Sequence, residues 1–233
     1  MKTHITKPMI VFGDIHGLSH WKKVVEENPN CRFLFLGDYL DPYTDISHNI
    51  LIENLKEIIQ LKKERGDEVI LLLGNHDLHY IYLNIDPCTR FDDEIEEAAH
   101  ALFSENRHLF QFAFQENKHI FTHAGISEKW FFDDFGGDPN RNLAEQFNNP
   151  DLDQLPALFR RGALRGGDRS LTGGILWADI DELNDPLQGY IQIVGHNRVG
   201  NILKRTVNNG EIIFCDCLFN DIWLFTHLEP RFS

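Results

Sequence analysis

Several apolar segments of this sequence end in carboxylate, amide or imidazole side chains, which can bind metal ions and transfer protons. The residues placed in this way are Asp14, His16, Asp38, Asp41, Asn75, His76, His123 and His196. Such ligands suit borderline divalent metals such as Mn²⁺, Fe²⁺ or Zn²⁺, and the thiolates that suit softer ions are missing from the set. The set exceeds the three protein ligands of a catalytic zinc site, and a carboxylate can bridge cations about 3.5 to 4 Å apart. The residue types therefore favour two metal ions over one.

The first three of these segments share one pattern: an apolar run, a Gly-Asp or Gly-Asn turn, and then a helical pattern. Residues 8–12 precede GDIHG, residues 32–36 precede GDYLD, and residues 68–73 precede GNHD. Continuous apolar runs indicate strands covered on both faces, as in a parallel sheet with crossover helices. Because such crossovers are right-handed, the polar turns should lie together at the carboxyl edge of the sheet, where ligands usually bind.

Apolar periodicity predicts the elements that follow. Helical spacing is found at Leu51, Leu55, Ile58 and Ile59, before the glycine of ERGD, and again at Ile95, Ala98, Ala99, Leu102 and Phe103. Phe110, Phe112 and Phe114 alternate with other residues, which predicts one half-buried strand. We expect surface excursions near residues 79–108 and 129–174, and such loops commonly carry substrate contacts.

After Gly174 the pattern is all-β, in the segments GILWAD, YIQIVGHN, NILKRTV, EIIFCDC and DIWLFTH. Asn209-Gly210 is the strongest hairpin signal. A parallel half followed by an antiparallel half predicts an α/β fold of two packed sheets with helices outside. The length of 233 residues suits a single domain over residues 1–233.

Composition limits the function classes. A formal charge of −14 and a pI near 5.2 argue against a nucleic-acid surface, which needs clustered Lys and Arg. No segment approaches the ~18 to 20 apolar residues of a membrane span, and the apolar part of the N-terminus is too short for a signal peptide. We therefore expect a cytoplasmic protein without a membrane partner. Its sparse cysteines are expected to be reduced and to serve in packing: Cys31, Cys88, Cys215 and Cys217.

The motifs GDIHG, GDYLD, GNHD, FTHAG and VGHN, in this order, resemble those of the calcineurin-like metallophosphoesterases, and the similarity covers most of the chain. HIFTHAGIS and ILWAD further resemble segments of the phosphoprotein (serine/threonine) phosphatase branch. The resemblance implies the αββα sandwich of that superfamily. It also implies two metals, one held by Asp14 and His16 and bridged through Asp38 to another held by Asn75, His123 and His196.

The resemblance implies that His76 protonates the leaving oxygen and that Asp41 orients His76. In that chemistry a metal-bound hydroxide attacks the phosphorus, the cations stabilise charge on the phosphoryl oxygens, and an imidazole titrates in the range that a general acid needs. Trp177 and Asp179 are expected near the site on the same grounds.

Two positions depart from the phosphoprotein phosphatase pattern. Arginines that grip the phosphate in that branch are replaced here by Pro42 and Leu73. Neither residue can imitate the fork of a guanidinium group. The candidate replacements are Arg198, Arg165 and Arg169, whose alternative role is that of solvated loop residues.

These observations favour a dinuclear metal-dependent phosphatase that hydrolyses a phosphomonoester, on a protein serine or threonine or on a small molecule. Mn²⁺ is the first expectation for the metals, with Fe and Zn as alternatives. A phosphodiesterase or dinucleoside polyphosphate hydrolase is the second hypothesis, because a diester carries less negative charge and the two arginines are absent. The third is a metal-binding recognition module without turnover.

Some polar residues have an ordinary structural interpretation. A lone histidine in an apolar strand is more often a core residue than a ligand, so His119 and His227 are expected to be structural. Asp77 is expected to be a helix N-cap. The remaining histidines are assigned to the surface or to helices: His4, His20, His48, His79, His100 and His108.

Overall fold

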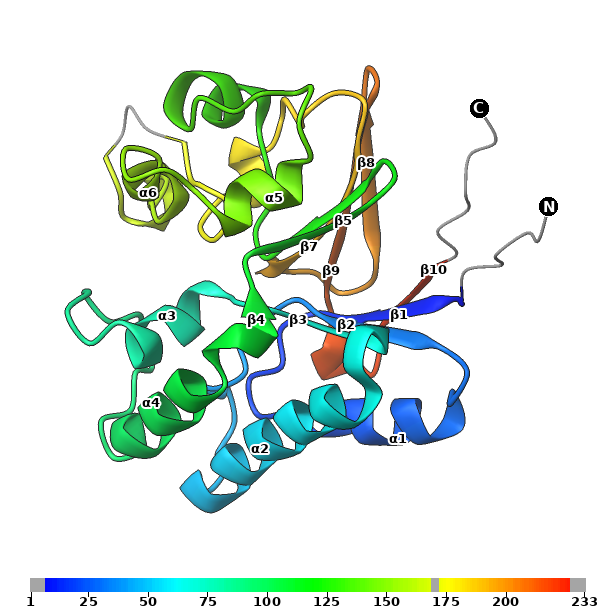
Figure 1. The fold of residues 1–233 in the computed structure, drawn as a ribbon, viewed down its shortest axis with the longest axis vertical. Helices are drawn as coiled ribbons and strands as arrows, with labels where there is room; N and C mark the ends of the chain where they lie inside the picture. The colour runs from blue at the N-terminus through cyan, green and yellow to red at the C-terminus, as the bar shows by residue number, and fades with distance from the viewer. Residues whose placement is uncertain (1–6, 169–171, 227–233) are drawn as a thin grey trace.

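Two five-stranded β-sheets pack against each other in the computed structural model, which describes residues 7–168 and 172–226 (Figure 1). The first sheet has the strand order β10-β1-β2-β3-β4 and the second β5-β6-β7-β9-β8. The strands of the first sheet are β1 (Met9–Phe12), β2 (Arg32–Phe35), β3 (Val69–Leu72), β4 (Phe110–Gln111) and β10 (Leu224–Thr226). Those of the second are β5 (Ala113–Glu116), β6 (His119–Thr122), β7 (Ile191–Arg198), β8 (Leu203–Val207) and β9 (Gly210–Asp216).

Helices flank both sheets, so the α/β sandwich predicted from the sequence is confirmed. The α-helices are α1 (His20–Glu27), α2 (His48–Arg65), α3 (Asn75–Ile81), α4 (Glu96–Glu105), α5 (Leu143–Asn148) and α6 (Leu155–Leu158). Short 3₁₀ turns cover Gly66–Glu68, Arg107–Leu109, Ala163–Arg165, Ile180–Glu182 and Leu218–Asn220, and a π-helical turn covers Trp130–Asp134. None of the helices within the described ranges is long and apolar enough to cross a lipid bilayer.

The first sheet is apolar on both faces, as its continuous hydrophobic runs indicate. Strands β1 to β4 are parallel, and β10 pairs with β1 in the antiparallel sense. In β1, Met9 and Val11 join a cluster with residues of the second sheet, whereas Ile10 and Phe12 pack in the cluster that includes α1 and α2. Because neighbouring side chains on a strand alternate between faces, both faces need apolar residues.

The helix predicted from Leu51, Leu55, Ile58 and Ile59 is α2, and all four side chains are buried. It ends at Arg65, directly before the expected glycine, Gly66, whose φ of 55° lies in the region that glycine adopts without steric cost. Figure 1 shows α2 lying with α1 under the first sheet.

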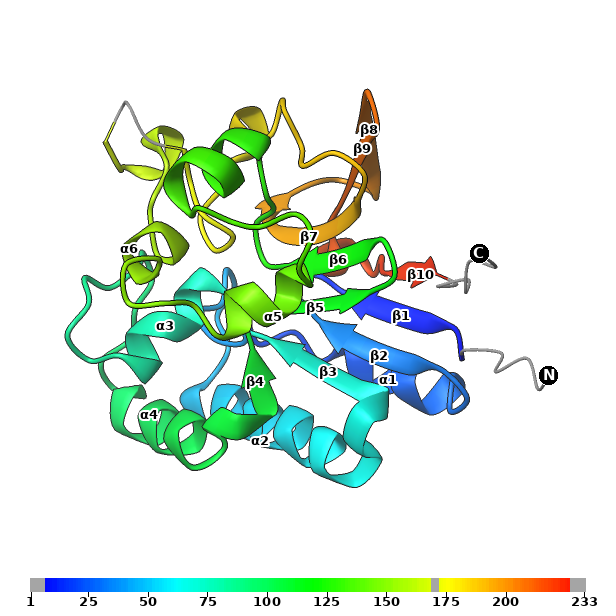
Figure 2. The same ribbon diagram turned by 45° about the horizontal axis from the view of Figure 1, so that its top comes forward.

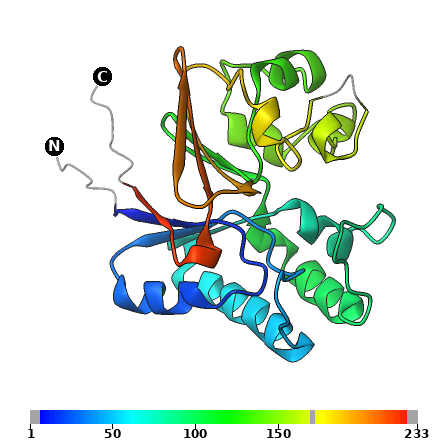
Figure 3. The ribbon, with the colours of Figure 1, turned by 180° about the vertical axis from the view of Figure 1, so that it is seen from behind.

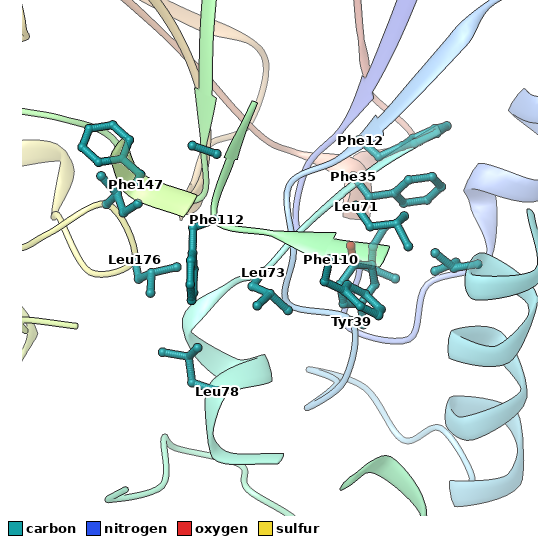
Figure 4. Close-up of a cluster of buried hydrophobic side chains, with 14 of the residues drawn as sticks. Phe12, Phe35, Tyr39, Leu71, Leu73, Leu78, Phe110, Phe112, Phe147 and Leu176 are labelled. Carbon is teal, nitrogen blue, oxygen red and sulfur yellow. The ribbon is translucent and has the colours of Figure 1, made fainter. Parts of the chain in front are cut away.

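The chain crosses from one sheet to the other within the stretch predicted as a single strand. Phe110 lies in β4 of the first sheet, and Phe114 lies in β5 of the second. Phe110 packs on Tyr39 with a ring-centroid distance of 5.6 Å, whereas Phe112 turns toward Leu176 (Figure 4). The prediction of one strand was therefore wrong, because the alternation continues through the crossover.

The segment predicted as an excursion over the surface near residues 129–174 also supplies core. Trp130, Phe131, Phe135 and Phe147 are buried and contact one another through their rings. Helix α5 packs on β5, as Figure 2 shows. The polar composition of this segment concealed a second group of aromatic core residues.

The C-terminal half is less antiparallel than predicted. Strands β6, β7 and β9 are parallel, and β8 pairs with β9 in a hairpin whose turn is Asn208–Asn209, one residue earlier than expected. The segment GILWAD forms a turn and not a strand, and β10 joins the first sheet beside β1 (Figure 3). The antiparallel interpretation was therefore correct only for the β8–β9 hairpin and the β10 pairing.

Candidate metal centre and its pocket

The ends of the first two strands bring together one group of candidate ligands. Asp14 and His16 follow β1, and Asp38 follows β2. The Nε2 atom of His16 lies 3.9 Å from Oδ2 of Asp14 and 3.7 Å from Oδ2 of Asp38. All three side chains are buried. Their ligand atoms lie within 4.8 Å of one another, which is close enough for one cation to contact all of them.

A second group shares Asp38 with the first. Nε2 of His123 lies 3.5 Å from Oδ2 of Asp38, and it lies 2.9 Å from Oδ1 of Asn75 and 3.2 Å from Nδ1 of His196. Asn75 is the first residue of α3, His123 follows β6, and His196 lies in β7. The structure thus brings together the complete set of ligands suggested by the sequence, with Asp38 between the two groups.

Hydrogen bonds to the backbone fix the imidazoles in the form that binds cations. Nδ1–H of His16 donates to the carbonyl of Leu40, and Nδ1–H of His123 donates to that of Leu36, each at 2.8 Å. A carbonyl only accepts, so Nε2 of each ring keeps its lone pair. Nε2 of His123 therefore faces the amide oxygen of Asn75, another acceptor. Acceptors that converge without a proton between them fit a cation site.

The electrostatics of the site agree with this donor set. Burial, together with the charge of Asp216, raises the pKa of Asp14 well above its ordinary value, and burial with the charge of Asp14 does the same for Asp38. Burial lowers the pKa of His16 and of His123 to about 3. Bound cations would offset the cost of gathering buried carboxylates and would bind imidazoles that are neutral.

Several site residues hold unusual backbone conformations. His16, Asp38, Asp41 and His196 have φ values of 42°, 52°, 58° and 61°, in the left-handed region that residues with a Cβ atom rarely adopt. His196 also lies where the β7–β9 register shifts between Val194 and Arg198. Such strain persists only where surrounding structure enforces it, and bulges re-aim side chains.

Glycines let the carboxylates approach the neighbouring backbone. A Cβ atom at Gly74 would collide with Oδ1 of Asp38, and one at Gly195 would collide with Oδ1 of Asp14. Because both positions lack a Cβ atom, Asp38 can accept a hydrogen bond from the amide of His76, and Asp14 can accept one from the amide of His196, each at 2.8 Å. The glycines therefore permit the hydrogen bonds that aim both carboxylates.

His76 and Asp41 form a buried pair beside the candidate metal centre. Nδ1 of His76 lies 2.6 Å from Oδ2 of Asp41, and the same carboxylate contacts His79 Nε2 at 3.0 Å and Tyr80 Oη at 2.7 Å. Burial favours the neutral form of Asp41, but the hydrogen bonds from His76, His79 and Tyr80 outweigh it and lower the pKa of this carboxyl group. Burial lowers the pKa of His76, and Asp41 opposes that shift. The pair can orient an imidazole that exchanges a proton with a bound molecule.

Two helix residues differ from the expectation. His79 was assigned to the surface or a helix; it lies in helix α3 but is buried there and contacts Asp41, a role that was not expected. Its spacing of three from His76 places both on one helix face, a signal present in the sequence. Asp77 is not the N-cap: Gly74 holds that position, and Asp77 accepts backbone hydrogen bonds from Asp38, Tyr39 and Gly74.

Arginines line the pocket of about 290 Å³ above the candidate metal centre, together with Asp38, Asn75, His76 and His196. They are Arg90, Arg161 and Arg165. The positive charge of Arg90 contributes to the lowered pKa of His76, and that of Arg165 contributes to the lowered pKa of His123. These side chains add positive charge to the pocket, although Pro42 and Leu73 stand at the two positions where phosphate-gripping arginines were expected.

The structure holds Arg90 and Arg165 in place. Nε of Arg90 donates to the carbonyl of Asp41 at 3.2 Å, and its guanidinium carbon lies 3.7 Å from the ring centroid of Tyr43. Nη2 of Arg165 donates to Oδ1 of Asn197 at 2.6 Å, and its Nε lies 2.8 Å from Oδ2 of Asp179. Asp179 and Trp177 therefore lie near the site, as the resemblance implied.

The predicted replacement arginines lie in different places. Arg165 lines the pocket. The guanidinium carbon of Arg198 lies 3.8 Å from the ring centroid of Tyr43 and 4.3 Å from that of Phe219. Arg198 lines a neighbouring hollow together with Asp14 and His16. Arg169 lies outside the described residues. Arg90 was missed because PCTRF has no motif, although it belongs to the excursion that directly follows GNHD.

Cys88 lies beside a candidate ligand and is not simply a packing residue. Nδ2 of Asn75 donates to its sulfur at 3.6 Å, and the thiol donates to the carbonyl of Asn75 at 3.3 Å. Burial raises the pKa of Cys88 to about 12, so the thiol stays protonated. It supports Asn75 and is not a thiolate ligand. All four cysteines are free in the structure, and their reduced state stays a prediction.

Comparison with known proteins places this geometry in context. Residues 7–211 match the calcineurin-like phosphoesterase family. One similar structure is a protein serine/threonine phosphatase from Saccharomyces cerevisiae with similarity to human phosphatase PP5, at 18% identity and a TM-score of 0.55, with 92% of this chain and 69% of that chain covered. Another is a cold-active protein-tyrosine phosphatase from a psychrophilic Shewanella species, at 17% identity and a TM-score of 0.54, with 91% and 71% covered. At these identities, the likeness concerns the fold.

Proposed function

Because the chain belongs to the calcineurin-like phosphoesterase family, we propose that it is a dinuclear metal-dependent phosphatase that hydrolyses phosphomonoesters. The observation that carries the proposal is the pair of ligand groups that share Asp38. A carboxylate between two groups of neutral imidazoles and oxygen donors is the arrangement that a pair of divalent cations requires.

In this proposal Asp14, His16 and Asp38 hold one cation, and Asp38 with Asn75, His123 and His196 holds the other. The cations would supply charge neutralisation for the phosphoryl oxygens and would lower the pKa of a water molecule. The oxygen and imidazole donors suit Mn²⁺ first, with Fe or Zn as alternatives. Cys88, as a protonated thiol beside Asn75, supports the choice of a metal that does not need thiolate.

The protein's own side chains would bind the phosphate and move the proton. Arg90 and Arg165 line the pocket and can donate charge-assisted hydrogen bonds to phosphate oxygens. His76 lines the same pocket and would donate its Nε2 proton to the leaving oxygen. Asp41 holds Nδ1 of that ring and stabilises the imidazolium form.

We propose a phosphate monoester as the substrate, on a protein serine or threonine or on a small molecule. Arginines in the pocket remove the reason for preferring a diester, which carries less negative charge. The charge of −14 supports the prediction that nucleic acid is not a partner. A cytoplasmic location and the absence of a membrane partner stay predictions from the sequence.

The test compares Mn²⁺-stimulated hydrolysis of p-nitrophenyl phosphate with that of bis(p-nitrophenyl) phosphate. We expect the monoester to react faster and Asp38→Asn to lose almost all turnover. A preference for the diester would support a phosphodiesterase. Inertness of fully metal-loaded protein on both esters would instead support a recognition module without turnover.

A further inference from the structure

A second hollow, of about 940 Å³, adjoins the metal pocket of about 290 Å³. Both are lined by Asn75, Cys88, Arg161 and Trp177, so they meet at a candidate metal ligand. A phosphate group placed on the metal ligands would lie in the smaller pocket. The group esterified to that phosphate can then extend into the larger hollow.

The walls of the larger hollow are mainly apolar. They include Leu78 and Ile81 of α3, Tyr82, Leu83 and Ile85 of the following loop, and Phe159 just after α6. Tyr82 and Phe159 both line it and contact each other, with ring centroids 5.8 Å apart.

The loop at the rim exposes several large apolar side chains that lie close together in the sequence. Tyr82, Leu83 and Ile85 are 38%, 53% and 41% exposed. Scattered exposed apolar residues need no explanation, but a contiguous group beside a pocket marks a binding surface.

We propose that this hollow binds large apolar side chains next to the phosphorylated residue of a peptide substrate, which deepens the phosphatase function proposed above and rests on it. Polar side chains at the same hollow favour a peptide over a lipid-like alcohol. Asn84 and Asp86 line it and are exposed, so they can pair with peptide amide groups, which need partners when they are covered. An alkyl chain offers them none.

Arg161 lines both the larger hollow and the metal pocket. Its Nη2 donates to the carbonyl of Asp86 at 3.0 Å, and its guanidinium carbon lies 4.5 Å from the ring centroid of Trp177. It therefore links the apolar loop to the segment that carries Arg165 and holds the rim beside the phosphate position.

The test uses two phosphoserine peptides of equal length and charge, one with Leu and Phe beside the phosphoserine and one with Ser and Gln. We measure the ratio of their kcat/KM values, which does not depend on the fraction of active protein. Burial of a large apolar side chain predicts a ratio of roughly ten or more in favour of the apolar peptide. The double variant Leu83→Ser/Ile85→Ser should bring the ratio close to one.

Leu203→Ser is the matched control, because Leu203 is an apolar residue of β8 that is 41% exposed and lines neither hollow. It should keep the ratio of the unaltered protein. Fluorescence anisotropy of both labelled peptides on His76→Asn protein gives a binding ratio without turnover, and we expect the same preference there.

A ratio near one in the unaltered protein, or a ratio unchanged in the double variant, would overturn the proposal. Faster turnover of octyl phosphate than of both peptides would overturn the peptide as the occupant. These outcomes differ from failure of the phosphatase function itself, in which Mn²⁺-loaded protein would not hydrolyse p-nitrophenyl phosphate.

Discussion

At the residue scale, a variant of His76 can distinguish proton transfer from metal binding, because His76 is proposed to do only the first. It lines the pocket and is held by Asp41, but it is outside both candidate ligand groups. His76→Asn should therefore keep the metals and lower kcat about 10²- to 10⁴-fold on an alkyl phosphate, whose leaving oxygen needs a proton. The loss on p-nitrophenyl phosphate should be smaller, because that leaving group departs without one.

The measurement is kcat on both esters, with metal content determined on the same samples. His108→Asn, an exposed histidine, serves as the control and should change neither rate. Equal losses on the two esters would contradict the role of His76 as leaving-group acid.

Arg90 and Arg198 allow a second comparison at the residue scale. Both guanidinium groups lie within 4 Å of the Tyr43 ring centroid, at 3.7 and 3.8 Å, but only Arg90 lines the metal pocket. A charged hydrogen bond contributes about 1.5–3 kcal/mol, so Arg90→Ala should raise KM for p-nitrophenyl phosphate roughly 10- to 100-fold.

Arg198→Ala removes the same kind of stacking on Tyr43 and should raise KM much less. Steady-state kinetics of the two variants at saturating Mn²⁺ decide the assignment. A larger effect from Arg198→Ala would mean that Arg198, as suggested from the sequence, contacts the phosphate. Arg90 would then only stabilise its own loop through its contacts with Asp41 and Tyr43.

At the element scale, the sequence predicted the ends of the parallel strands correctly, but it did not predict where the chain passes from one sheet to the other. The ligands Asp14, Asp38 and Asn75 follow buried strands, whose apolar runs are read directly from the sequence. Arg90 reaches the pocket from a loop without periodicity, so only tertiary structure brings it there. The change of sheet between Phe110 and Phe114 is hidden for a similar reason, since both sheets bury alternate side chains.

One side chain of α5 forms hydrogen bonds to the backbone where the chain passes from one sheet to the other. Oδ1 of Asn148 accepts from the amides of Phe112 and Ala113, at 2.8 and 3.1 Å, and its Nδ2 donates to the carbonyl of Ala113 at 2.8 Å. Asn148→Ala would leave these backbone groups without partners, which should lower the free energy of unfolding by about 2–3 kcal/mol. Urea denaturation measures the change.

Asn149→Ala provides the neighbouring control. Its side chain donates one exposed hydrogen bond to the carbonyl of Glu145, at 3.1 Å, so the expected loss is below about 1 kcal/mol. Similar small losses in both variants would mean that the crossover is held by packing of Phe112 and not by Asn148.

At the scale of the whole molecule, the candidate metal centre joins the two sheets. Asp14, Asp38 and Asn75 follow strands of the first sheet, whereas His123 follows β6 and His196 lies in β7, both strands of the second. Metals held there would act as a link between the layers. Ions at about 100 times their dissociation constant contribute about 2.7 kcal/mol per site, which corresponds to a rise in Tm of roughly 5–10 °C for a chain of this size.

Asp38→Asn tests that link without changing side-chain shape. The amide oxygen can still accept from the amide of His76, but the buried negative charge beside Asp14 is gone. Because an uncompensated buried charge destabilises the fold, metal-free Asp38→Asn should have a Tm at least as high as that of the metal-free parent. The Tm of Asp38→Asn should rise little on addition of Mn²⁺, since the shared ligand is lost.

Asp45→Asn, which changes an exposed aspartate nearby in sequence, should keep the full Mn²⁺-induced rise in Tm. A full rise in Asp38→Asn, measured by differential scanning calorimetry with and without chelator, would show that the cations do not depend on Asp38 and would remove the bridge from the proposed site.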